Sequence, residues 1–174
     1  MKQYTVHPTG HEQSFQENDI IVSKTDLKGI ITYANKTFIE VSGYSEEELL
    51  GQPHNIIRHP DMPHCVFKLL WDTLEQGQEI FAYVNNMCKN GDHYWVFAHV
   101  TPTFDDAQHI IGYHSSRRVP DRRQVKVFAD LYAKLGQEER RHKDWQTGME
   151  AAGQMLRDVL ASKHTSYEEF VFSV

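Results

Sequence analysis

The sequence predicts an α+β fold: one five-stranded antiparallel sheet with helices on one face, followed by further C-terminal helices. Three observations predict it. Two short β-rich runs come first, short helices and one clear amphipathic helix occupy the middle, and three β-rich runs follow. Because strands and helices are grouped rather than alternating, an antiparallel sheet is favoured over a parallel one.

The first strands are predicted at Ile20 to Lys24 and at Ile30 to Ala34, and "DLKG" between them forms the turn of a hairpin. A short helix around Phe38 is expected to end at Gly43. Ser45 with Glu48 three residues later has the pattern of a capping box, which begins a second short helix.

"MPHCVFKLLWDTLEQG", residues 62–77, has apolar positions at helical spacing and ends in glycine, so it predicts the longer helix. The last three strands are predicted in residues 79–87, 92–104 and 109–119. Asn-Gly between the first two of these is a strong hairpin signal.

Composition narrows the class of protein. The chain has 174 residues, 40% of them hydrophobic, and a net charge of −6, which disfavours nucleic-acid binding. No apolar run approaches the roughly 18 residues that a membrane span requires. The first residues lack an apolar signal core, so we expect a cytoplasmic protein. Cys65 and Cys88 fit a reducing compartment.

Three regions are predicted: an N-terminal extension at 1–18, a sensor domain at 19–119 and a helical segment at 120–174. Pro120 and Asp121 mark the start of the last region. Its second apolar stripe has heptad-like steps through Trp145, Met149, Ala152, Leu156 and Val159. This stripe favours a homodimer, or a fold back onto the sheet of the same chain.

Four motifs carry a family resemblance: "ITYANKTFIEVSGYSEEELLGQPHNIIRHPDMP", "FKLLWDTLEQG", "KNGDHYWV" and "IIGYHSSR". From about Ile20 to Arg118 the chain resembles a PAS domain, and closely the flavin-binding PAS sensor of bacterial aerotaxis receptors. The resemblance implies a non-covalently held FAD, read out as oxidised or reduced, in a cytoplasmic signalling module. His54 stands where light-sensing relatives carry their reactive cysteine, so we expect no covalent flavin adduct.

The resemblance also implies cofactor-binding residues. Arg58, His59 and Asp61 carry over from the "RHPD" of the family, and Arg58 could instead simply pair with Asp61. Asn86 and His114 match strand positions that face the polar edge of the flavin ring. An Asn amide offers a donor and an acceptor to that edge. The alternatives are a turn role for Asn86 and a core hydrogen bond for His114.

Four further positions match family sites near the ligand. They are Asn35, His54, Asn55 and Trp71. An Asn that opens a helix is commonly a cap, a His or Asn in this loop can serve as a cap or a loop hydrogen bond, and a helix Trp is commonly core. Each residue therefore has a structural alternative to ligand contact.

No catalytic arrangement shows at a diagnostic spacing, so we expect no enzyme activity. The favoured hypothesis is a sensor of redox state or oxygen. A change at the flavin would alter hydrogen bonds of Asn86 and His114, and the sheet would pass this to the helix after Pro120 and on to an unidentified signalling partner.

Three other functions stay open. A haem-based gas sensor could take its axial ligand from His54, His59 or His64. A PAS module without cofactor could serve only to bind a partner. A metal site could combine the three histidines with Asp61, although their spacing is not a zinc signature.

Overall fold

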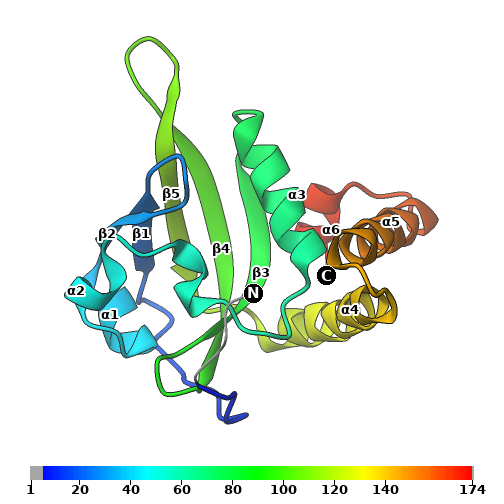
Figure 1. Ribbon diagram of the computed structural model, residues 1–174, viewed down its shortest axis with the longest axis horizontal. Helices are drawn as coiled ribbons and strands as arrows, with labels where there is room; N and C mark the ends of the chain where they lie inside the picture. The colour runs from blue at the N-terminus through cyan, green and yellow to red at the C-terminus, as the bar shows by residue number, and fades with distance from the viewer. Residues whose placement is uncertain (1–5, 174) are drawn as a thin grey trace.

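The computed structural model describes residues 6–173, and Figure 1 shows a curved sheet flanked by helices. The elements in chain order are β1 (Ile21–Thr25), β2 (Ile31–Ala34), α1 (Lys36–Ser42), α2 (Glu46–Leu49), the 3₁₀ helix η1 (His54–Ile57), α3 (His64–Glu75), β3 (Ile80–Met87), β4 (His93–Phe104), β5 (Ile110–Arg118), α4 (Arg122–Arg141), α5 (Trp145–Ser162) and α6 (Tyr167–Ser173).

The five strands form one antiparallel sheet in the order β2-β1-β5-β4-β3. The predicted α+β class is confirmed, and each predicted strand is present. Both predicted hairpins form, β1–β2 and β3–β4. The last strand, β5, lies between them and pairs with β1 on one side and β4 on the other. This topology brings residues from the start and the end of the domain together at the centre of the sheet.

The predicted helix signals are also confirmed. Asn35 caps α1, and Gly43 ends it with φ of 73°, a left-handed conformation that suits glycine. Ser45 and Glu48 form the reciprocal capping box of α2. Asp121 caps α4, as its position after Pro120 predicted.

Helices cover both faces of the sheet. Helices α1–α3 and η1 lie on the inner face, whereas α4 and α6 pack on the other side of β3 and β4. The Tyr83 ring stacks on Phe128 of α4 with centroids 4.3 Å apart. Trp95 of β4 also packs on this helix, with its ring centroid 6.2 Å from that of Tyr132. The core is therefore two apolar layers, one on each side of the sheet.

The C-terminal segment folds back on its own chain. Ala152 and Leu156 of the predicted stripe are buried against the α3 and α4 side of the molecule. Gly148 lets α5 approach α4, because a Cβ atom there would overlap the carbonyl oxygen of Glu139. Trp145, predicted in the same stripe, is 62% exposed, because it opens α5 at a position that turns away from the core.

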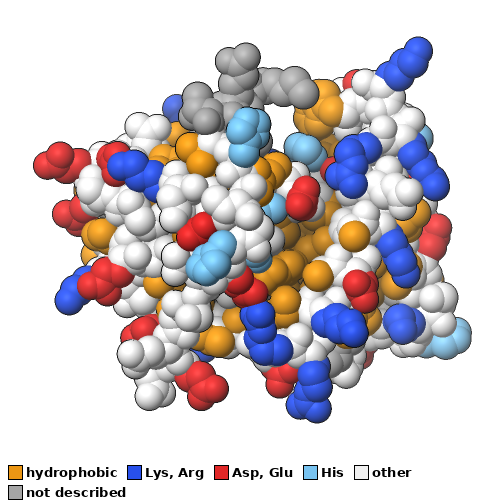
Figure 2. All heavy atoms as spheres, turned by 90° about the horizontal axis from the view of Figure 1, so that it is seen from below, with side chains coloured by type: hydrophobic (Ala, Val, Ile, Leu, Met, Phe, Trp, Pro, Cys, Tyr) orange, Lys and Arg blue, Asp and Glu red, His pale blue; other side chains and the backbone are white. Residues whose placement is uncertain are grey.

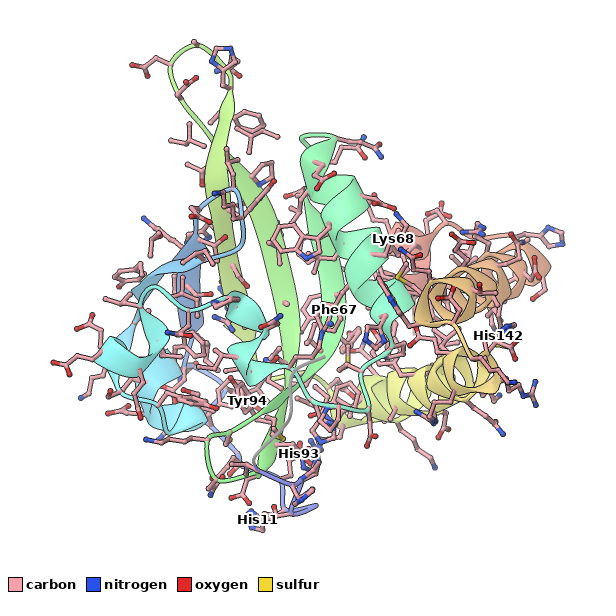
Figure 3. All side chains as sticks on the ribbon, viewed as in Figure 1. His11, Phe67, Lys68, His93, Tyr94 and His142 are labelled. Atoms are coloured by element: carbon pink, nitrogen blue, oxygen red, sulfur yellow. The ribbon has the colours of Figure 1, made fainter. Side chains whose placement is uncertain are left out.

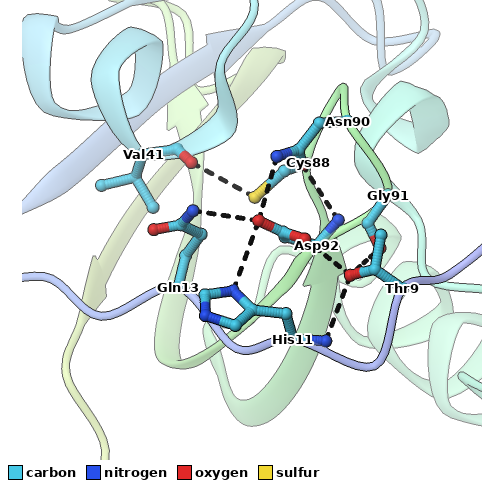
Figure 4. Close-up of polar contacts among 8 residues, drawn as sticks. All are labelled: Thr9, His11, Gln13, Val41, Cys88, Asn90, Gly91 and Asp92. Carbon is cyan, nitrogen blue, oxygen red and sulfur yellow. Dashed lines mark hydrogen bonds and ion pairs between the residues drawn. The ribbon is translucent and has the colours of Figure 1, made fainter.

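The N-terminal segment is attached to the β3–β4 hairpin, although the sequence predicted only an irregular extension (residues 1–5 lie outside the described range). Thr9 and Gln13 donate to the two carboxylate oxygens of Asp92 at 2.6 and 3.0 Å, and His11 lies 3.4 Å from it (Figure 4). Glu12 makes a two-pronged ion pair with Arg122, the first residue of α4.

Replacing Asp92 with asparagine is expected to release this segment. Hydrogen bonds from Thr9 and Asn90 lower the pKa of Asp92 to about 2, so the anion accepts from several donors at once. An amide has only one acceptor oxygen and places an NH₂ group against those donors. We expect faster proteolytic cleavage within residues 6–13, with the exposed-loop variant Asp106→Asn as control; equal cleavage rates would contradict the prediction.

The same segment should respond to acid. The folded-state pKa of Asp92 lies below its unfolded value of about 3.9, so its stabilising contribution is present above that pH and is lost as the pH falls through about 2. Cleavage of the wild type should therefore approach that of the variant only in strong acid.

Charged side chains of both signs are interspersed on the face seen in Figure 2, and hydrophobic side chains are visible in a depression near its middle. Within residues 6–173, no helix combines the length and the apolar character needed to cross a bilayer.

Candidate ligand-binding site

A cavity of about 380 Å³ lies between the inner face of the sheet, α3, η1 and the β1–β2 turn. Helix α3 supplies an aromatic and aliphatic wall through Phe67, Leu70 and Trp71. Phe67 projects from α3 toward η1 in Figure 3. The volume is within the range of about 300–1,000 Å³ that small-molecule sites occupy.

The polar lining of the cavity is cationic. Lys28, Arg58 and Arg117 line it, and the lining residues within the described part of the chain include no Asp or Glu. Apolar walls with several cations and no carboxylate suit a flat apolar ligand that carries negative charge.

Backbone contacts hold η1 and the loop after it over the cavity. Ile30 pairs with Pro53, and the His54 amide donates to the Gly29 carbonyl at 2.9 Å. At the other end of η1, Arg58 forms an isolated bridge with Asn86 of β3. The loop is thus attached by backbone hydrogen bonds at both of its ends, to the β1–β2 turn and to β3.

Arg58 lies against the aromatic wall. Its guanidinium carbon is 3.7 Å from the centroid of the Phe67 ring, a cation–π contact that fixes the long side chain beside the cavity. A guanidinium held this way can meet a phosphate or carbonyl oxygen with little loss of entropy.

A buried polar chain links β5, β1 and η1. Arg117 donates to the Ser23 hydroxyl at 2.6 Å, and that hydroxyl lies 2.9 Å from Nε2 of His54. Burial and the nearby Arg117 lower the pKa of His54 to about 3, so the imidazole is neutral at physiological pH. Because Ser23 accepts from Arg117, its own proton is available for His54 Nε2.

Five of the nine predicted cofactor residues line the cavity. They are His54, Asn55, Arg58, Trp71 and Asn86. The Trp71 ring makes an edge-to-face contact with Tyr113 at 5.2 Å, so it belongs to the wall and to the core at once. Contact of these residues with a ligand stays a prediction.

Three predicted residues have structural roles outside the lining. Asn35 accepts from the Phe38 and Val22 amides, which is the cap alternative. His59 is buried against His93 and accepts from the Asp61 amide, while the Asp61 carboxylate points to solvent, 82% exposed. Of the three residues carried over from "RHPD", only Arg58 reaches the cavity.

His114 is placed on the opposite side of the sheet from the expected one. Strand β5 presents Tyr113, Ser115 and Arg117 to the cavity, and because strand side chains alternate, His114 projects from the other face. It pairs in register with Lys24 and Thr101 there. The hydrogen-bonding role predicted for it from the resemblance does not fit this geometry.

The side chains of the three candidate ligand histidines, His54, His59 and His64, do not meet at one site. His54 bonds Ser23, His59 packs on His93, and His64 lies 2.9 Å from Glu139 of α4. In residues 6–173 no three His, Cys, Asp or Glu side chains come together as a metal site would require. The free thiols of Cys65 and Cys88 are buried, which raises the pKa of each to about 12.

Sequence reasoning missed four lining residues that the geometry makes prominent: Ser23, Phe67, Tyr113 and Arg117. A signal was available for the last of them. Arg117 and Arg118 are neighbours in a strand, so one of the two must project from the face of the sheet that carries the cavity.

The fold and the cavity define the class of protein. Residues 31–117 match the family model described as PAS fold, which is half of the chain, and the chain belongs to the PAS family.

Among curated proteins, the chain is 42% identical over 131 residues to the aerotaxis receptor of Escherichia coli K12, covering 74% of this chain and 26% of the receptor. It is 28% identical over 112 residues to a nitrogen fixation regulatory protein of Klebsiella pneumoniae, covering 64% of this chain and 23% of that protein. The chain thus spans about a quarter of these relatives.

Solved structures support the fold. The light state of the Aureochrome1 LOV photoreceptor matches with a TM-score of 0.58 and 18% identity, covering 63% of this chain and 88% of that one. A light-oxygen-voltage domain described with a flavin analogue matches with a TM-score of 0.56 and 20% identity, covering 64% and 83%.

Proposed function

We propose that this chain is a cytoplasmic sensor of redox state or oxygen that holds FAD non-covalently in its PAS cavity and has no enzyme activity. The observation that carries the proposal is the cavity itself, with an aromatic wall on α3, three cations and no carboxylate in its described lining. The 42% identity to an aerotaxis receptor supports the sensing role.

The residues fit such a group. A flavin ring is flat and largely apolar, with one polar edge and a negatively charged phosphate tail. Phe67 and Trp71 would bound the ring, Asn86 offers an amide to its polar edge, and Arg58 suits a phosphate or carbonyl. When bound, the flavin supplies the electron acceptor, and the protein sets its potential through charge and hydrogen bonds.

Strand β3 offers the route for the signal. Val84 and Asn86 face the cavity, while Tyr83, the residue before Val84, projects from the other face toward α4. The Tyr83 hydroxyl donates to Gln124 at 2.6 Å, and its carbonyl accepts from Tyr132 at 2.8 Å. A shift of β3 that follows a changed hydrogen bond at Asn86 therefore moves groups bonded to α4.

The output goes to an unidentified signalling partner. We also propose a homodimer, and this part rests on the family resemblance alone. The apolar stripe of α5 no longer supports it, because Ala152 and Leu156 at its centre are buried within one chain. Sedimentation at two concentrations tests it.

The proposal predicts a yellow protein. An absorption spectrum of the freshly purified chain should show flavin bands, and denaturation followed by chromatography should release FAD at close to one equivalent. A Soret band would replace the proposal with a haem sensor. A colourless protein that ignores added FAD would replace it with a PAS module that binds only a partner.

A further inference from the structure

Arg117 is the most deeply buried charge in the cavity wall. It is 2% exposed, and its guanidinium lies 4.5 Å from the centroid of the Phe38 ring. Its Nη2 donates to Ser23, but Nε and Nη1 are enclosed by protein and have no hydrogen-bond acceptor in the described structure. A buried cation without a counter-charge is costly, so such a group demands an explanation.

The neighbouring groups do not provide the counter-charge. Ser23 is neutral, and His54 beyond it is neutral because of its low pKa. Within residues 6–173 no carboxylate lies within 4.0 Å of Arg117 or lines the cavity with it. The buried phenol of Tyr94 does not supply it either, because burial raises the pKa of that phenol far above physiological pH and keeps it neutral.

Arg117 also has a defined place along the cavity. Arg117 pairs with Ile21, the first residue of β1. Lys28 lies beyond the other end of β1, in the turn that follows Thr25. Four strand residues span about 13 Å. The cavity therefore has an exposed cation at the β1–β2 turn and a buried one at its opposite end.

We infer that Arg117 is the cation whose counter-charge the bound ligand supplies, so that the electron-rich pyrimidine edge of the flavin ring lies at the Arg117 end of the cavity. This inference rests on the proposed function. In a medium of low dielectric constant the attraction acts over several ångströms and requires no direct hydrogen bond. It is strongest for the reduced flavin, which carries its negative charge on that edge.

The test compares Arg117→Gln with Arg118→Gln. Arg118 is the next residue, has the same charge and is exposed on the opposite face. For each protein, the affinity of the apoprotein for added FAD and the midpoint potential of the bound FAD, titrated with a chemical reductant, are measured. By linkage, the shift in potential gives the change in preference for reduced over oxidised FAD.

Arg117→Gln is expected to weaken the preference for reduced FAD at least about tenfold, the lower limit of what a nearby charge does to a buried ionisable group. That corresponds to a midpoint potential about 30 mV more negative for a two-electron couple. Arg118→Gln should leave affinity and potential at wild-type values.

The outcomes separate the two proposals. If the wild type binds FAD and Arg117→Gln matches it in potential and affinity, the inference is wrong and the proposed function stands. If the wild type binds no flavin, both are wrong. If Arg117→Gln does not fold, the wild type decides alone: it should bind reduced FAD more tightly than oxidised FAD, and the reverse order overturns the inference.

Discussion

Phe38→Ala is expected to destabilise the domain by about 3–5 kcal/mol, the range for removing a buried aromatic ring. Phe38 is 0% exposed, and its ring packs against both His54 and Arg117. The centroid of the Phe38 ring lies 6.0 Å from that of the His54 ring and 4.5 Å from the guanidinium carbon of Arg117. Alanine would leave a void under the polar chain from Arg117 to His54. The loss therefore combines apolar burial with a cation that has lost its aromatic contact.

Urea denaturation followed by circular dichroism measures the effect. Phe38→Leu keeps most of the volume and removes the ring face, so it should cost clearly less than alanine while still weakening ligand retention. Lys36→Ala, at an exposed position on the same helix, should stay within about 0.5 kcal/mol of the wild type. A Phe38→Ala loss as small as that of Lys36→Ala would show that α1 is not part of the cooperative core.

Local signals predicted the framework of the fold well. The Asn-Gly turn, the Ser45–Glu48 capping box and the Asp121 cap each depend on residues within four positions of one another, and all three form. Arg58, Trp71 and Asn86, which the resemblance placed near a ligand, line the cavity, and their contact with a ligand stays a prediction.

The rest depended on register, which local signals do not fix. A shift of one residue moves every side chain of a strand to the other face, and the pairing of both β1 and β4 with their neighbours contains an irregularity, at Lys24/Thr25 and Thr103/Phe104. His114 projects from the face opposite to the expected one, and Arg117, which no motif singled out, lines the cavity. The attachment of Thr9 to Asp92 was equally hidden, because 83 residues separate them.

Glu139→Ala is expected to lower the free energy of unfolding by about 0.5–2 kcal/mol, the range for removing the side chain that caps a helix N-terminus. Helix α3 begins at His64 after Pro63, which provides no side-chain cap. The Glu139 carboxylate of α4 takes that place: it accepts from the His64 and Cys65 amides at 3.0 and 2.9 Å. Helix α3, which forms one wall of the cavity, is thus capped by a side chain of the C-terminal segment.

A matched control is Glu138→Ala. Glu138 is the preceding residue and pairs with Arg141 and His142 on its own helix, so its loss should cost about 0.5 kcal/mol or less. Because α3 carries Phe67 and Trp71, only Glu139→Ala should also weaken FAD retention. Equal effects of the two variants on stability would contradict the role of Glu139 as a cap.

The pH dependence distinguishes a charged cap from simple packing. Burial raises the pKa of Glu139, but hydrogen bonds from His64 and the Cys65 amide outweigh it, and the folded-state pKa lies below its ordinary value. Its stabilising contribution is therefore present above the unfolded pKa of about 4.3 and is lost as the pH falls through the folded value. The stability difference between wild type and Glu139→Ala should shrink in that acid range, whereas a difference due to packing alone would persist there.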